Sequence, residues 1–221
     1  MRIILFGATG MVGQGVLREC LVDGDVTRVL CVGRRPSGEQ HPKLHELVVP
    51  DLYDYSAVLG QLRDYDACFF CLGVSSVGMK EDDYRRVTYD LTLAAGRTLA
   101  RLNPQMTFIY VSGAGSDSTE RGSVMWARVK GATENALMRL PFKAAYMFRP
   151  GFIEPMHGVR SKTALYQAAY VIARPIFGLL QRWAPDRVTT SVKVGRAMLM
   201  AAKRGAPTPL VEVPDINRLG G

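Results

Sequence analysis

The sequence has 221 residues, four cysteines and a formal net charge of +8 at pH 7. This length and the ordinary share of apolar residues predict one globular domain with a sizeable core, and the positive charge favours anionic partners. The chain shows no basic block, basic–aromatic stripe or nucleic-acid motif, so nucleic acid is not an expected partner, and it shows no export signal, which predicts a cytoplasmic protein with reduced thiols.

The first predicted element is an apolar strand from Met1 to Phe6, and a glycine-rich loop follows it without a gap. In such a loop Gly7 permits a tight turn, Gly10 lets the backbone approach phosphates, and Gly13 lets the next helix pack closely on the strand. This arrangement is typical of a βαβ unit that holds a dinucleotide pyrophosphate on the N–H groups of a helix N-terminus. The loop residues expected to contact the cofactor are Gly7, Thr9, Gly10, Met11, Val12 and Gly13.

Residues 12–21 repeat apolar side chains at helical spacing, and residues 27–32 form a second strand rich in β-branched residues. The position that selects the dinucleotide lies at the end of this strand and holds Arg34 and Arg35, with no carboxylate. An acidic residue there binds the ribose of NAD, whereas arginine accommodates the additional phosphate of NADP. We therefore expect NADP(H) as the cofactor in preference to NAD.

Strand and helix patterns alternate along the rest of the chain, with no linker, low-complexity tract or internal repeat. Further strands are predicted at 44–49, 66–72, 106–111 and 144–149, helices at 55–62, 83–102, 123–140 and 191–202, and a last edge strand at 210–216. This alternation predicts an α/β fold of the Rossmann type, a doubly wound parallel sheet with helices on both faces, in a single domain over residues 1–221.

Residues 153–190 differ from this pattern and are expected to form a helical insertion on the substrate or partner side. Residues 164–183 are strongly apolar, but Arg174, Pro175 and Arg182 interrupt the run of roughly 20 apolar residues that a membrane helix needs. We expect a pair of amphipathic helices that cover a pocket or meet a partner, a second copy of the chain included, in preference to membrane contact.

Cys68 and Cys71 have the spacing of some metal and redox motifs, but they lie in a predicted buried strand. Side chains three residues apart on a strand point to opposite faces, so the two thiols are expected to be separate core residues. His41 and His45 lie four residues apart in a predicted loop, with no matching ligand pair. No metal site is expected.

Five short motifs lie at the ends of the predicted strands. They are Gly7 to Gly13, Asp51-Leu52, Cys71-Leu72-Gly73, Tyr110-Val111-Ser112 and Arg149-Pro150-Gly151. Together they resemble the short-chain dehydrogenase/reductase superfamily in its extended or atypical NAD(P)-binding branch, and the compact length and Arg34–Arg35 pair are most similar to the small subgroup around the Tat-interacting, oxidoreductase-like proteins. The resemblance implies further cofactor contacts at Asp51, Leu52, Cys71, Leu72, Gly73, Lys130, Pro150, Gly151 and Phe152, while Arg149 is expected to be structural.

The resemblance also implies three catalytic positions: a serine that binds the substrate oxygen, a tyrosine that transfers a proton, and a lysine four residues later that holds the nicotinamide ribose. Ser112 and Lys130 match the serine and the lysine, but Trp126 occupies the tyrosine position. An indole N–H can donate a hydrogen bond, yet it is not an acid or base near neutral pH. The usual proton relay therefore does not carry over.

Trp126 leaves more than one function open. The first is an NADP(H)-dependent oxidoreductase that acts on an unidentified small carbonyl or alcohol, with the proton supplied by Tyr84, Tyr89, Ser112 or water. The second is a non-catalytic protein that binds NADP(H) as a structural or redox-sensing ligand. A nucleotide-sugar epimerase or dehydratase fits less well, because those enzymes usually carry a larger C-terminal substrate domain and the same tyrosine.

Overall fold

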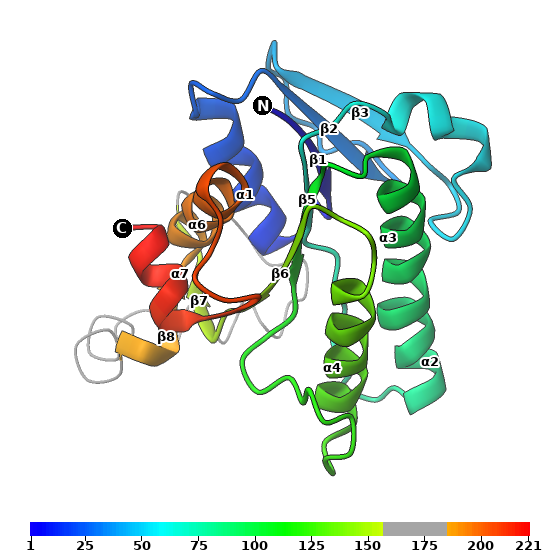
Figure 1. Ribbon diagram of the computed structural model, residues 1–221, viewed down its shortest axis with the longest axis vertical. Helices are drawn as coiled ribbons and strands as arrows, with labels where there is room; N and C mark the ends of the chain where they lie inside the picture. Colours follow the sequence, from blue (N-terminus) through cyan, green and yellow to red (C-terminus); the bar gives the residue numbers. More distant parts are fainter. Residues whose placement is uncertain (157–184) are drawn as a thin grey trace.

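A computed structural model describes residues 1–156 and 185–221 of the chain. Its centre is a parallel sheet of seven strands in the order β3-β2-β1-β4-β5-β6-β9 (Figure 1). The strands are β1 (Arg2–Phe6), β2 (Arg28–Gly33), β3 (Leu44–Val48), β4 (Ala67–Phe70), β5 (Thr107–Val111), β6 (Ala144–Arg149) and β9 (Leu210–Glu212). The chain runs outward from β1 to β3 and then returns to β4 and runs the other way. The predicted doubly wound sheet is confirmed, and its switch point between β1 and β4 is where such sheets bind ligands.

The apolar strands are buried on both faces of the sheet, as β1 illustrates. Ile3 and Leu5 belong to one core, and Ile4 and Phe6 belong to the other. All four side chains are fully buried. Because both faces are covered, β1 reads as an unbroken apolar run instead of an alternating one.

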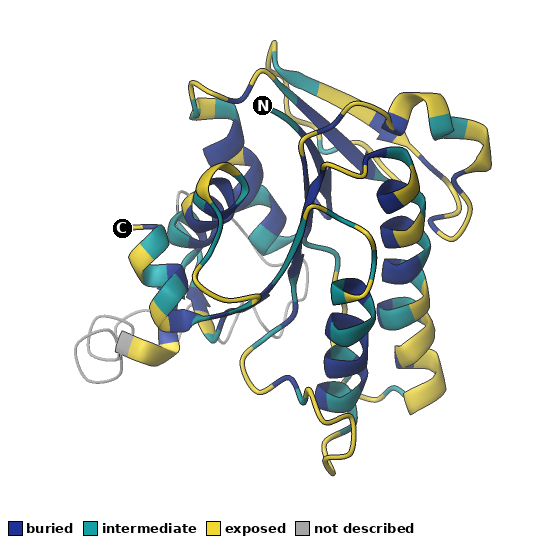
Figure 2. Cartoon of the chain, in the orientation of Figure 1, coloured by how far each residue is buried: buried dark blue, intermediate teal, exposed yellow. Residues whose placement is uncertain are grey.

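Helices cover both faces of the sheet (Figure 1). One face carries α1 (Met11–Val22), α6 (Ser191–Arg204) and α7 (Val213–Leu219), and the other carries the 3-10 helix η1 (Ser56–Leu62), α2 (Glu81–Arg85), α3 (Leu91–Leu102) and α4 (Met125–Met138). Figure 2 shows the buried residues of α3 and α4 on their inner sides and the exposed residues facing outward. The helices thus protect the sheet and leave the carboxyl ends of its strands to form a site.

The last predicted strand is correct only in its first half. β9 ends at Glu212 and pairs with β6 at the sheet edge, and α7 begins at Val213. Pro214 stands in the first turn of α7, where its fixed φ and missing N–H suit the start of a helix. The proline therefore starts a helix here and does not merely limit the pairing of a strand.

The ends of the predicted helical insertion at 153–190 are strands, which corrects that prediction for the described residues. β7 (Phe152–Glu154) and β8 (Val188–Thr190) pair in a separate parallel sheet, with a short 3-10 turn η3 (Pro185–Arg187) before β8. β-branched and aromatic residues favour strands in both segments. The amphipathic helices predicted at 164–183 lie outside the described residues. Within the described part of the chain, no helix is long and apolar enough to span a membrane.

The thiols of Cys68 and Cys71 lie on opposite faces of the sheet, which confirms the prediction from their spacing. Cys68 belongs to the core beneath α3 and α4, and Cys71 packs against the core beneath α1 and α6. All four cysteines are free. Among residues 1–156 and 185–221, no three metal-binding side chains come together.

Candidate functional site

The glycine-rich loop after β1 makes a turn that only small residues permit. Gly7 has a φ of +82°, and its carbonyl accepts a hydrogen bond of 2.9 Å from the N–H of Gly10. A Cβ on Gly7 would lie 2.7 Å from the carbonyl carbon of Cys71, and a Cβ on Gly13 would lie 2.0 Å from the Gly7 oxygen. The first glycine therefore makes the turn and the third lets α1 pack on it, as the sequence predicts.

Gly10 is the N-cap residue of α1, and neither its backbone conformation nor its packing inside the protein requires a glycine. Its φ of −83° suits any residue, and a Cβ there would meet only the Gly7 oxygen, at 3.4 Å. Among the residues that the structure describes, no side chain caps this helix, and its first turn contains no acidic residue. The positive end of a 12-residue helix thus remains available to an anion.

A cavity of about 900 Å³ opens at the switch point of the sheet, between the glycine loop and the loops after β2, β3 and β4. The structure brings eight of the predicted cofactor residues to its wall. These eight are Gly7, Thr9, Arg34, Arg35, Asp51, Leu52, Leu72 and Gly73. They come from four separate strand ends, so the sequence motifs describe one site.

Arg34 and Arg35 are both exposed, and both line this cavity. In the described part of the chain, no carboxylate forms an ion pair with either of them. The neighbouring Glu46 instead accepts hydrogen bonds from the N–H and the hydroxyl of Ser37. Two free cations at the end of β2 can form charge-assisted hydrogen bonds to a phosphate.

The other predicted cofactor residues lie outside the wall of this cavity. They are Gly10, Met11, Val12, Gly13, Cys71, Lys130, Pro150, Gly151 and Phe152. The first four belong to the glycine loop and α1, and the side chain of Cys71 packs into the core. The last four lie at or near the ends of β5 and β6, a second part of the same edge of the sheet.

The helical segment after β4 contributes a part of the wall that was not predicted from the sequence. Asp83, Arg86, Val87 and Leu91 line the cavity, together with Tyr53 from the loop after β3. In a doubly wound sheet the helix after a strand starts at the same edge as the ligand, so its first turns were candidates. The sequence carries no local pattern that distinguishes these positions from solvated ones.

The two predicted catalytic residues meet where α4 passes the end of β5. Ser112 directly follows β5, its N–H donates to the Phe148 carbonyl at 2.8 Å, and the amino group of Lys130 donates to the Ser112 carbonyl. The Ser112 hydroxyl is buried and donates its proton to Glu134 Oε1 at 2.5 Å, with the Phe148 carbonyl oxygen also near it at 3.1 Å. It thus points into the protein, toward a carboxylate that no sequence motif indicates.

Trp126 lies one helical turn before Lys130 on α4, beside the loop that follows β5. A Cβ on Gly115 would lie 3.5 Å from the edge of the indole ring. Lys130 retains partial exposure, but the surrounding protein removes enough solvation to lower the pKa of its amino group to about 8, against a smaller opposing effect of Glu134. The position therefore holds a cation that can lose its proton near neutral pH.

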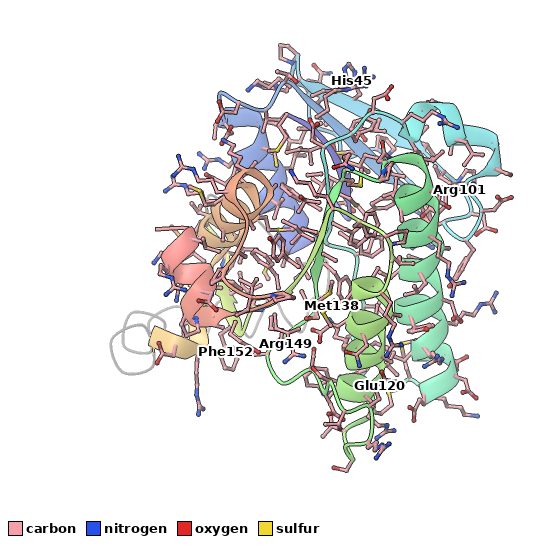
Figure 3. The ribbon with its side chains drawn as sticks, in the orientation of Figure 1. His45, Arg101, Glu120, Met138, Arg149 and Phe152 are labelled. Carbon is pink, nitrogen blue, oxygen red and sulfur yellow. The ribbon has the colours of Figure 1, made fainter. Side chains whose placement is uncertain are left out.

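Glu134 is the centre of a buried charge network at this end of the sheet. Its carboxylate is completely buried and accepts hydrogen bonds from Arg149 Nε at 3.0 Å and Nη2 at 2.5 Å. Arg149 also reaches Glu212 at 3.2 Å, and these contacts raise the pKa of its guanidinium. Figure 3 shows Arg149 at the end of β6, in the same region as Phe152 and remote from His45. This geometry agrees with the structural role expected for Arg149.

The residues around the cavity fit a dinucleotide. The tight approach of Gly7 to Cys71 and the uncapped α1 form a cradle for a pyrophosphate, and Arg34 and Arg35 supply charge for a further phosphate. A doubly wound sheet with such a turn and a cavity at its switch point defines a dinucleotide-binding α/β protein of the Rossmann type.

Comparison with known proteins identifies the family. The profile of the NAD dependent epimerase/dehydratase family matches residues 3–119, more than half of the chain. The chain therefore belongs to this family, within the extended short-chain dehydrogenases/reductases that the sequence motifs resemble. Its fold also matches that of MoeE5 in complex with UDP-glucose and NAD, with a TM-score of 0.64 and 15% identity over 98% of this chain and 79% of that one.

Two relatives match almost the whole chain. Protein FMP52, mitochondrial, of Chaetomium globosum is 24% identical over 225 residues, covering 98% of this chain and 96% of that protein. Protein HTATIP2 of Rattus norvegicus is 28% identical over 224 residues, covering 99% and 88%. The second relative agrees with the subgroup that the sequence motifs indicate. The mitochondrial names of FMP52 and its fungal counterparts contradict the expectation of a cytoplasmic protein.

Proposed function

We propose that the protein binds NADP(H) across the carboxyl ends of β1, β2 and β4. The observation that carries the proposal is the pair Arg34 and Arg35 at the end of β2, lining the same cavity as Gly7 and Thr9 with no carboxylate partner among the described residues. The glycine cradle holds the pyrophosphate, and the two guanidinium groups bind the 2′-phosphate that distinguishes NADP from NAD.

Calorimetric titration of the purified protein tests this preference. We expect NADPH to bind at least about tenfold more tightly than NADH, since charge-assisted hydrogen bonds to the phosphate are each worth more than neutral ones. Arg34→Asp should remove most of that difference. Arg101→Asp on the outer side of α3 (Figure 3) is the matched control, because Arg101 is remote from the cavity and should leave both affinities unchanged. Equal affinity of the unaltered protein for NADPH and NADH would overturn the proposal.

We further propose that the protein is an oxidoreductase acting on a small carbonyl or alcohol. When bound, NADPH supplies a hydride to a carbonyl carbon, and the oxygen then needs a proton. The Lys130 amino group can hold that proton at neutral pH and release it, because its pKa is lowered to about 8. Glu134 and Ser112 keep the end of β5 fixed beside it. Like Lys130, Tyr84 and Tyr89 lie outside the wall of the described cavity, so the lowered pKa of Lys130, and not its position, favours it as the donor.

A second candidate is an NADP(H)-binding protein without turnover. Two observations favour it: Trp126 replaces the proton-transferring tyrosine, and the Ser112 hydroxyl is engaged by Glu134. An assay of NADPH oxidation at 340 nm against a panel of carbonyl compounds separates the candidates. Turnover that disappears in Lys130→Ala supports the enzyme. An inert protein that gains turnover only as Trp126→Tyr supports the binding protein.

The family match also allows an epimerase or dehydratase acting on a nucleotide sugar. Such an enzyme oxidises and then reduces the sugar, which depends on the same tyrosine position that Trp126 occupies here. Conversion of UDP-glucose to its 4-epimer without net NADPH consumption would favour this alternative over the reductase.

A further inference from the structure

The helical segment that borders the cavity contains one wider turn. α2 continues without interruption into the π-helical turn η2 (Arg86–Asp90) and then into α3. The N–H of Leu91 donates to the carbonyl of Arg86, five residues earlier, and this bond defines the π turn. Arg86, Val87 and Leu91 all line the cavity. Single π turns of this kind are frequent at functional sites, because the extra residue changes the direction of the side chains around it.

Tyr53, from the loop after β3, is fastened to this turn in two ways. Its hydroxyl donates to the Arg86 carbonyl at 3.1 Å, and the Arg86 guanidinium carbon lies 5.8 Å from the centre of the Tyr53 ring. The N–H of Tyr53 is itself held by Asp51 at 2.9 Å. The side chains of Tyr53 and Arg86 therefore form a pair that bridges two separate segments of the cavity wall.

The Arg86 guanidinium has no carboxylate partner among the described residues, although acidic residues are near it in sequence and in the cavity. Asp83 lines the cavity three residues earlier but forms no ion pair with it, and Asp51 holds the Tyr53 N–H. The side chain of the adjacent Arg85 instead lies outside the cavity wall, with its guanidinium carbon 4.1 Å from the centre of the Tyr89 ring. Two adjacent arginines thus separate into a cavity residue and a surface residue.

The wall near Arg86 is apolar and aromatic, with Leu52, Tyr53, Val87 and Leu91, whereas the end of β2 provides Arg34, Arg35 and Ser37. A flat apolar base suits the first group of side chains, and a phosphate suits the second. A guanidinium that already lies over one ring can stack a second aromatic plane on its other face.

We propose that Arg86 and Tyr53 form a clamp in which the Arg86 guanidinium stacks on the adenine base of bound NADP(H). This inference rests on the proposed NADP(H) binding and assigns Arg86 a contact with the base, separate from the phosphate contacts of Arg34 and Arg35. The hydrogen bond from Tyr53 fixes the main chain of Arg86, and the Tyr53 ring lies under its guanidinium before the cofactor arrives, which reduces the entropy lost on binding.

The test is calorimetric titration with NADPH and with 2′,5′-ADP, the adenosine part of the cofactor. Arg86→Ala should weaken both by about tenfold, the amount that loss of one stacking contact on a base removes. Arg86→Lys should be nearly as weak as Arg86→Ala, because an ammonium keeps the charge but cannot stack. Arg85→Ala is the matched control, with the neighbouring charge removed from outside the cavity, and should bind as the unaltered protein does.

Each other result has a definite meaning. Full affinity in Arg86→Ala, with a normal melting temperature, overturns the clamp while NADP(H) binding stands. Full affinity in Arg86→Lys also overturns it, because the contact would then be with a phosphate. If the unaltered protein binds neither NADPH nor 2′,5′-ADP, the proposed function itself fails and the clamp fails with it. Tyr53→Phe gives a second check, since loss of the hydroxyl bond alone should weaken 2′,5′-ADP severalfold without changing the fold.

Discussion

The amino group of Lys130 donates a hydrogen bond to the main-chain carbonyl of Ser112, and this bond joins α4 to the end of β5. The hydroxyl of the same serine is bound on its other side by Glu134, one helical turn after Lys130. The pair that resembles a catalytic serine and lysine is therefore part of the support of the sheet. A cofactor or substrate that uses either group has to exchange a bond the protein already makes.

The buried charge of Glu134 gives a prediction about stability. Glu134→Gln should lower the free energy of unfolding by about 3 kcal/mol, because it removes the buried carboxylate from Arg149 and leaves the half-exposed Glu212 as the ionic partner of that guanidinium. Urea denaturation followed by circular dichroism measures the change. Glu212→Gln removes the second carboxylate from the same arginine, but its side chain is 47% exposed, so the loss should stay below about 1 kcal/mol. Equal losses in the two variants would contradict the assignment of Glu134 as the principal partner.

The glycine loop gives a prediction that separates folding from binding. Gly13→Ala places a Cβ 2.0 Å from the Gly7 oxygen, so α1 must move and the unfolding free energy should fall by about 2 kcal/mol. Gly10→Ala meets only one atom, at 3.4 Å, and should cost less than about 1 kcal/mol. Its methyl group nevertheless stands where a pyrophosphate approaches the helix, so NADPH affinity should drop at least about tenfold.

Thermal melting and calorimetric titration of the two variants measure these effects. Gly24→Ala serves as the control, because a Cβ there meets nothing within 4 Å and should change neither quantity. A Gly10→Ala variant that binds NADPH normally would show that the phosphates do not approach the backbone at this residue.

Local patterns in the sequence predict much of this fold, because the information they need is short-range. Cys68 and Cys71 could be assigned to opposite faces since strand geometry alone decides it. The last strand was overextended because Pro214 suits a helix start as well as an edge strand, and only packing decides between the two.

The site was predicted less completely, because its decisive contacts join residues far apart in the chain. The Ser112 hydroxyl donates to Glu134, which lies 22 residues later in the chain. No pattern near the serine indicates that its hydroxyl points into the protein. Arg86 begins a π turn beside the cavity, and its main-chain carbonyl is bonded by Tyr53, 33 residues earlier. Propensity does not identify a π turn, since its stability depends on the tertiary contacts around it.

The four free thiols should be unreactive in the folded protein. Burial raises the pKa of Cys31 to about 12, and it also raises the pKa values of Cys20, Cys68 and Cys71 well above the usual range of a thiol. Since the thiolate is the reactive form, a disulfide reagent at pH 8 should label the native protein slowly and all four cysteines rapidly in guanidinium chloride. One thiol that reacts within seconds in the native state would contradict this prediction.

Lys130 gives a prediction about pH. Loss of solvation lowers its pKa to about 8 in the folded protein, whereas an unfolded lysine titrates near roughly 10.4. Between these two values the unfolded chain binds more protons, so the stability of the protein relative to Lys130→Met should rise as pH increases from about 8 to about 10.

Lys203 is the matched control, because its pKa shifts in the opposite direction. Despite some loss of solvation, hydrogen bonds with Asp23 and Asp25 raise the pKa of its amino group. The contribution of Lys203 to stability is therefore present below roughly pH 10.4 and lost above it. Denaturation curves at pH 7, 8, 9 and 10 for the unaltered protein, Lys130→Met and Lys203→Met measure the rise caused by Lys130, whereas the difference between the unaltered protein and Lys203→Met should stay constant over this range. A constant difference between the unaltered protein and Lys130→Met over this range would mean that Lys130 stays protonated at the end of β5, which would remove it as the proton donor of the proposed reductase.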